Sequence, residues 1–64
     1  MFYDQLARLC EEQGRTPSAV ALAAGMSKAN VTNWKNGASP TLATIDRLAR
    51  ELNVSVTALL NDTP

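Results

Sequence analysis

Apolar side chains recur every three or four residues along most of this chain, which is the spacing of one face of an α-helix. In the first block, Phe2, Leu6, Leu9 and Cys10 fall on one stripe, and charged residues occupy the opposite side. Gly14 follows this block and supplies the left-handed conformation in which many helices end. The pattern therefore predicts a first helix that ends before Gly14.

Residues 42–52, with the sequence LATIDRLAREL, have the clearest helical pattern. Thr41 precedes them as a side-chain cap, and Asp46 and Arg50 are spaced for an i,i+4 ion pair. The expected apolar face consists of Leu42, Ile45, Leu48, Ala49 and Leu52. A last helix is predicted over VTALL, capped by Ser55, before the polar ending NDTP. Its expected apolar face consists of Val56, Leu59 and Leu60.

Two shorter helices are predicted in the middle of the chain. Thr16 and Pro17 have the properties of an N-cap and a first helical residue, and the sequence SAVALAA continues this helix until Gly25. Ser27 is expected to cap the next helix, over residues 28–36. Only three residues are expected between the two helices, so the helices must cross steeply.

The apolar spacing is helical rather than alternating and no β-hairpin signal is present, which predicts an all-α fold, and no repeat or low-complexity segment indicates a second domain. With 64 residues the chain is expected to form one domain over residues 1–64, in which residues 61–64 are a polar tail or the start of a linker. The composition, 45% hydrophobic and 19% charged, is typical of a globular protein. A chain of this size buries only about 60% of its unfolded surface, so its stability is expected to be marginal.

The residue types needed for catalysis or metal binding are scarce in this sequence. It has no histidine, no glycine-rich phosphate loop and one cysteine, Cys10, which lacks a partner for a disulfide, a zinc site or a Cys/His pair. Glu11 and Glu12 diverge by about 100° on a helix, so they cannot act together on one substrate. We therefore expect no enzyme activity, no metal and no cofactor, and we expect Cys10 to be a small buried hydrophobe rather than a redox sensor.

The apolar runs are all shorter than the ~20 residues of a membrane-spanning helix, and the first residues, MFYDQLARL, lack the features of a signal peptide. A cytoplasmic location is therefore expected.

Charge is unevenly distributed, although six basic and six acidic residues give a formal net charge of zero. Residues 13–45 contain no acidic residue and carry Arg15, Lys28 and Lys35. On the helix over residues 28–36, Val31 and Trp34 point to one side as a core anchor. The other side presents short, polar or basic side chains: Lys28, Ala29, Thr32, Asn33, Lys35 and Asn36. Exposed lysines often serve solubility alone, but a helix free of carboxylates also suits the major groove of DNA.

Two stretches, SAVALAAGMSKANVTNWKNG and SPTLATIDRLARELNVSVTALL, resemble the DNA-binding domain of the lambda-repressor/Cro-type family, also called XRE-like, over nearly the whole chain. The matching positions are Ala21, Gly25, Val31, Trp34, Asn36 and Gly37, together with the closing LNVSVTALL. The resemblance implies a compact five-helix bundle with a helix-turn-helix at its second and third helices. It implies base contacts by Lys28, Ala29, Thr32 and Asn33. It implies phosphate contacts by Thr16, Pro17, Ser18, Ser27, Lys35, Asn36, Gly37 and Ser39.

The resemblance further implies a sequence-specific transcriptional repressor of phage or bacterial type that occupies an operator in double-stranded DNA. Such domains usually bind as homodimers on pseudo-palindromic half-sites. The expected dimerisation surface consists of Val56, Thr57, Leu60 and Asn61. The chain is expected to be either a small Cro-like protein or the first part of a longer repressor.

Two departures from the family pattern leave an alternative open. Pro17 stands where members often carry a phosphate-binding glutamine, and the stretch ASPTLAT lacks the basic residues common there. Fewer phosphate contacts predict weaker binding and a shallower salt dependence. The alternative is a protein-interaction module on the same fold, such as an antitoxin subunit or an adaptor, with weak or no DNA binding.

Overall fold

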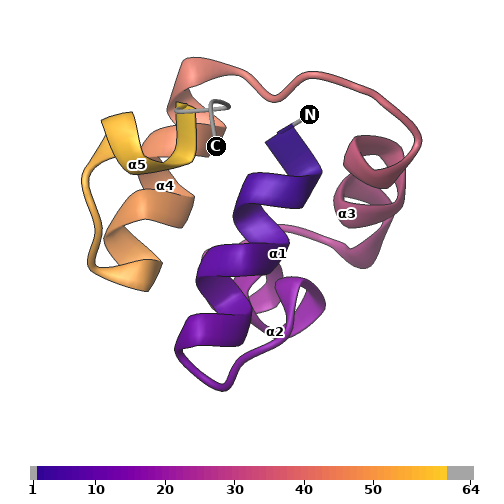
Figure 1. The fold of residues 1–64 in the computed structure, drawn as a ribbon. Helices are drawn as coiled ribbons and strands as arrows, with labels where there is room; N and C mark the ends of the chain where they lie inside the picture. The colour runs from indigo at the N-terminus through magenta and orange to yellow at the C-terminus, as the bar shows by residue number, and fades with distance from the viewer. Residues whose placement is uncertain (1, 61–64) are drawn as a thin grey trace.

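The computed structural model describes residues 2–60, and within this range it consists of helices and their connections (Figure 1). The helices are α1 Phe2–Glu12, α2 Pro17–Ala23, α3 Lys28–Lys35, α4 Leu42–Leu52 and α5 Val56–Leu60. Helix α1 lies at the centre of Figure 1, with α3 on one side of it and α5 on the other, and it packs against both. The described part of the chain measures 26 × 22 × 21 Å. The predicted all-α, five-helix architecture is confirmed.

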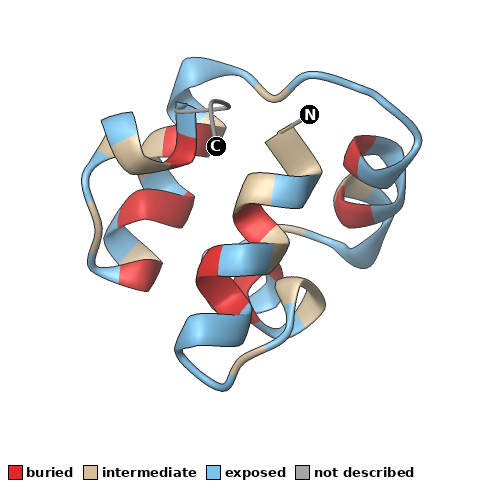
Figure 2. Cartoon of the chain, viewed as in Figure 1, coloured by how far each residue is buried: buried red, intermediate tan, exposed pale blue. Residues whose placement is uncertain are grey.

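A single hydrophobic core fills the space between the helices, and buried positions face inward on each of them (Figure 2). Leu6 of α1, Leu48 of α4 and Leu59 of α5 have relative exposures of 0%, 0% and 2%. The other members are Leu9, Cys10, Val20, Ala21, Val31, Trp34, Ile45, Ala49 and Leu52. Every described helix therefore contributes to one core.

Two leucines expected on apolar faces lie outside this core. Leu42 is 74% exposed and Leu60 is 51% exposed. Leu42 is the first residue of α4, where the side chain extends toward the preceding loop and beyond the packed part of the helix. In α5 the inward position is taken by Leu59, and the next residue is turned away from it by about 100°. The predicted faces of these two helices were wrong at these positions.

Three of the predicted N-caps are present. The Oγ1 of Thr16 accepts a hydrogen bond from the amide of Ala19 at 3.1 Å, and the Oγ1 of Thr41 accepts one from Thr44 at 3.2 Å. The Oγ of Ser55 accepts one from the amide of Ala58 at 3.2 Å. Each cap satisfies one of the amide groups that a helix start leaves without a partner.

The fourth predicted cap residue, Ser27, occupies the N-cap position of α3, but its side chain makes no capping hydrogen bond. The hydroxyl of Ser27 donates instead to Oδ1 of Asn30 at 2.9 Å, and it makes no bond to a helix amide. The helix behind it ends at Lys35, one residue earlier than expected, with Asn36 as its C-cap. The connection from α2 to α3 comprises residues 24–27, so it is one residue longer than the sequence suggested.

Side chains of α1 and of the loop behind it bind the carboxyl ends of α4 and α5. The side-chain amides of Gln5 and Gln13 donate to the carbonyl oxygens of Ala58 and Leu52 at 2.8 and 2.7 Å. Arg15 binds Glu51 twice, to its Oε2 at 2.6 Å and to its carbonyl oxygen at 3.1 Å. Arg15 is one of the three basic residues of the acid-free residues 13–45, and its charge is therefore paired within the fold.

Cys10 is completely buried and unpaired, as expected of a small apolar residue. Burial raises the pKa of its thiol, and the nearby charge of Arg15 partly opposes this shift. A protonated thiol inside the core has little nucleophilic reactivity.

The Arg15–Glu51 pair is expected to stabilise the domain more than the Asp46–Arg50 pair of α4 does. The first joins segments far apart in sequence and is about 30% exposed, whereas the arginine of the second is 81% exposed. Arg15→Gln should lower the free energy of unfolding by about 1–2 kcal/mol. Arg50→Gln should lower it by less than about 0.5 kcal/mol. Urea denaturation followed by circular dichroism measures the free energy of unfolding of both variants. Equal decreases would show that the Arg15–Glu51 pair stabilises the domain no more than the Asp46–Arg50 pair does.

Candidate nucleic-acid interface

The turn between α2 and α3 brings two short helices together at a fixed angle. Gly25 adopts a φ of +86°, which side-chain-bearing residues rarely take. Its amide bonds the carbonyl of Leu22, and the amide of Met26 bonds the carbonyl of Ala21 at 2.8 Å. Ala21 is completely buried, so its small side chain permits close approach of the neighbouring helices. This is the structure of a helix-turn-helix.

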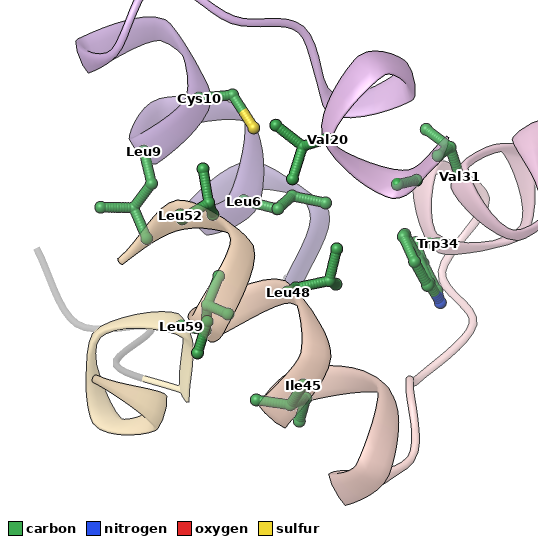
Figure 3. Close-up of a cluster of buried hydrophobic side chains, with 12 residues drawn as sticks. Leu6, Leu9, Cys10, Val20, Val31, Trp34, Ile45, Leu48, Leu52 and Leu59 are labelled. Atoms are coloured by element: carbon green, nitrogen blue, oxygen red, sulfur yellow. The ribbon is translucent and has the colours of Figure 1, made fainter. Parts of the chain in front are cut away.

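The inner side of α3 is held by two residues one helical turn apart. Val31 is 7% exposed and lies beside α2, whereas Trp34 is 3% exposed and extends toward Leu48 of α4 (Figure 3). The ring of Phe2 meets the Trp34 ring edge to face, with centroids 5.5 Å apart and an interplanar angle of 82°. The prediction that Val31 and Trp34 are core residues is confirmed.

The outer side of α3 is open to solvent and contains no acidic residue. Each of the side chains predicted to contact bases is exposed: Lys28, Ala29, Thr32 and Asn33. Lys28 and Lys35 form no ion pair with any other residue in the described range. The hydroxyl of Thr32 donates to the carbonyl of Lys28 at 3.3 Å, and its oxygen remains able to accept a hydrogen bond. The surface thus combines donors, short side chains and unpaired positive charge.

The predicted phosphate-contacting residues lie around this surface with different accessibility. The exposed members are Thr16, Ser27, Lys35, Asn36, Gly37 and Ser39, and the half-buried members are Pro17 and Ser18. The amide of Gly37 donates to the carbonyl of Trp34 at 3.0 Å. This bond closes the end of α3, and the phosphate contact expected of Gly37 stays a prediction.

Four amides near this surface have no acceptor among the described residues. They belong to Ser18 in α2, to Lys28 and Ala29 in α3, and to Ser39 in the following loop. Amides in the first turn of a helix point along its axis and attract anions. The arrangement can therefore bind phosphate oxygens through the backbone, which partly offsets the shortage of basic side chains.

Sequence reasoning missed one polar contact at the start of α3. Asn30 is half-buried and holds the Ser27 hydroxyl, so the two side chains brace the beginning of the helix together. The spacing S-x-x-N is close to the capping-box pattern, in which the fourth residue is normally Glu or Gln. The S-x-x-N spacing is therefore the sequence feature that could have predicted the contact between Ser27 and Asn30.

The predicted dimerisation residues differ in their exposure to solvent. Thr57 and Leu60 are exposed on α5, whereas Val56 is half-buried against the core. Asn61 lies outside the described residues.

Other kinds of site find little support in residues 2–60. This part of the chain holds no group of three or more His, Cys, Asp or Glu side chains placed to bind a metal ion. None of its helices has the length and apolar character needed to cross a membrane.

Comparison with known families gives one match, and it covers most of the chain. The family model described as helix-turn-helix, of the lambda-repressor (XRE) type, matches residues 6–59, which include all of α2, α3 and α4. Comparisons with curated proteins and with solved structures gave no significant match.

Replacing Gly25 should destabilise the domain because of backbone conformation rather than crowding. A Cβ at this position would meet only Nη1 of Arg47, at an ordinary contact distance of 4.0 Å. The left-handed conformation costs a side-chain-bearing residue about 1–2 kcal/mol, and less for asparagine. Thermal denaturation should therefore rank the variants as wild type, then Gly25→Asn, then Gly25→Ala. If Gly25→Ala were as stable as the wild type, the turn would not require a left-handed residue.

Proposed function

The chain belongs to the helix-turn-helix family of the lambda-repressor type, and from this premise we propose that it is a sequence-specific repressor whose helix α3 enters the major groove of double-stranded DNA. The family is one of DNA-binding regulators, which are not typically enzymes. The specific role of α3, the operator geometry and the repressor activity are parts of the proposal.

The observation that carries this proposal is the contrast between the two sides of α3. Its inner side is held by Val31 and Trp34, and its outer side is exposed, free of acid and flanked by the unpaired Lys28 and Lys35. An isolated helix of eight residues is unstable in water, so this one depends on the bundle for its shape. A rigid polar helix of this kind fits a major groove about 12 Å wide.

In the proposed complex, side chains of α3 read the base edges. Lys28 donates to guanine acceptors, Asn33 forms paired hydrogen bonds with adenine, and Ala29 and the methyl of Thr32 contact thymine methyl groups. The phosphates on either side are bound by the side chains and free amides of the surrounding residues. These are Thr16, Ser18, Ser27, Lys35, Asn36, Gly37 and Ser39, with Pro17 contributing contact without a donor.

One recognition helix covers only a few base pairs, so we propose that two copies bind together. Helices α3 and α5 lie on opposite sides of α1 (Figure 1), which leaves α5 accessible while α3 occupies DNA. Pairing through the exposed Thr57 and Leu60, with Val56 beside them, would place two recognition helices on half-sites about 34–36 Å apart, and Asn61 remains a predicted member of this surface from the sequence alone. Occupying an operator in this way excludes RNA polymerase, as in repressors of phage or bacterial type acting in the cytoplasm.

The competing function is a protein-interaction module, and one observation favours it. Residues 13–45 contain three basic residues, and Arg15 is paired with Glu51 within the fold. Only Lys28 and Lys35 of this segment are therefore left to attract phosphate, among the residues that the structure describes. An antitoxin subunit or an adaptor on this fold would show no salt-dependent binding to random DNA.

Lys28→Glu should strongly weaken DNA binding while leaving the fold intact. Electrophoretic shifts on random duplex DNA at low and moderate salt should show binding by the wild type that weakens as salt increases. The variant should bind at least about tenfold more weakly, because it places a carboxylate against phosphate. Its thermal midpoint should remain close to that of the wild type, since Lys28 is exposed and unpaired.

Arg50→Glu is the matched control, because it makes the same change in net charge on α4, away from α3. It should bind random DNA nearly as well as the wild type. Equal weakening by both variants would indicate attraction to overall charge rather than to α3. No salt-dependent shift by the wild type would favour the interaction module.

A further inference from the structure

The orientation of α3 depends on few contacts. This helix packs mainly against α1 and α2, and its buried residues are Val31 and Trp34. Val31 lies next to α2, the helix that the turn connects directly to α3. Trp34 is nearer the other end of α3, and contacts from other helices must hold it in place.

The first turn of α1 supplies such a contact. Phe2 places its ring edge to face with Trp34, and this is the one aromatic pair within the described residues. Edge-to-face pairs have a preferred geometry, because the positive edge of one ring meets the negative face of the other. An aliphatic side chain of similar size fills space but has no such directional preference.

Phe2 also borders the loop that follows α3. It lines an open cavity of about 210 Å³ together with Ser39, Pro40, Ile45, Leu59 and Leu60. One ring therefore lies between α3 and the segment that carries Ser39, a proposed phosphate contact. Because one side of the Phe2 ring borders this cavity, the edge-to-face contact with Trp34 is a directional contact that can fix the position of the ring.

We propose that Phe2 is a positioning residue for DNA recognition, which sets the tilt of α3 through Trp34 without touching DNA. This inference rests on the proposed function of α3. The tilt of α3 affects base contacts because a rotation of the helix about Val31 displaces both of its ends. Lys28 and Trp34 are each about 4.5 Å along the axis from Val31, so a shift of about 1 Å at Trp34 moves Lys28 by a similar distance. Hydrogen bonds to base edges tolerate only a few tenths of an ångström.

Three variants separate this role from general packing. Phe2→Leu keeps an apolar side chain and removes the ring, and Phe2→Tyr keeps the ring at a position that borders the open cavity. Tyr3→Leu is the matched control, because Tyr3 is also half-buried in the same turn and has no ring contact. Residual dipolar couplings of each free protein report the angle between α3 and α4. Titrations with an operator selected from random sequences and with random DNA report recognition.

Phe2→Leu should rotate α3 by about 10° or more against α4, a change large enough to disturb a preorganised site. It should weaken operator binding about tenfold and random-DNA binding less than about twofold, because loss of a base contact affects only specific binding. Phe2→Tyr should restore both the angle and the affinity, and Tyr3→Leu should change neither.

The inference is overturned if Phe2→Leu leaves the α3 angle unchanged, or if the angle changes and the preference for operator over random DNA does not. Equal effects of Phe2→Leu and Tyr3→Leu would also overturn it, since packing alone would then account for them. A wild-type protein that fails to bind any DNA would instead remove the proposed function. The dipolar couplings, measured without DNA, would still decide whether Phe2 orients α3.

Discussion

The clamping of α3 by its inner side is the constraint on which the rest of this structure depends. A helix of eight residues cannot persist alone in water, and it carries asparagine and threonine, which favour helix formation weakly. Burying Val31 and Trp34 provides the stability that its own sequence lacks. The side chains of the outer face are therefore not needed to hold α3 in place, so their chemistry can suit a binding partner.

The distribution of charge follows the same division. Ion pairs join Arg8 to Glu12 on α1 and Arg50 to Asp46 on α4, and Arg15 is paired with Glu51. The lysines of α3 have no such partner within the described part of the chain. A protein with zero net charge can thus present a locally positive surface, and free amides at the helix starts add to it. Overall charge is a poor guide to DNA binding in such a case.

Local signals in the sequence predicted the helices and most of their boundaries. The caps at Thr16, Thr41 and Ser55 depend on a hydroxyl and an amide three residues apart, so they can be recognised from spacing alone. Ser27 has the same spacing but a competing acceptor in Asn30, and propensity does not tell which bond forms. The contacts that join distant segments had no local signal: the Arg15–Glu51 pair, the Phe2–Trp34 pair and the bonds from Gln5 and Gln13. The exposed face of α3 was predictable because helical periodicity separates it from Val31 and Trp34.

The most direct measurement of the central claim is a titration of the isotopically labelled wild-type chain with duplex DNA, followed by the amide resonances of each residue. A groove-reading α3 requires that the amides of Lys28 through Asn36 shift strongly, together with those at the start of α2 and in the loop around Ser39. With a duplex that carries a single half-site, so that one copy binds, the amides of α5 and of the carboxyl half of α1 should move little. Resonances of α3 that stay unchanged while DNA binds elsewhere, or that stay unchanged because no DNA binds, would contradict the account.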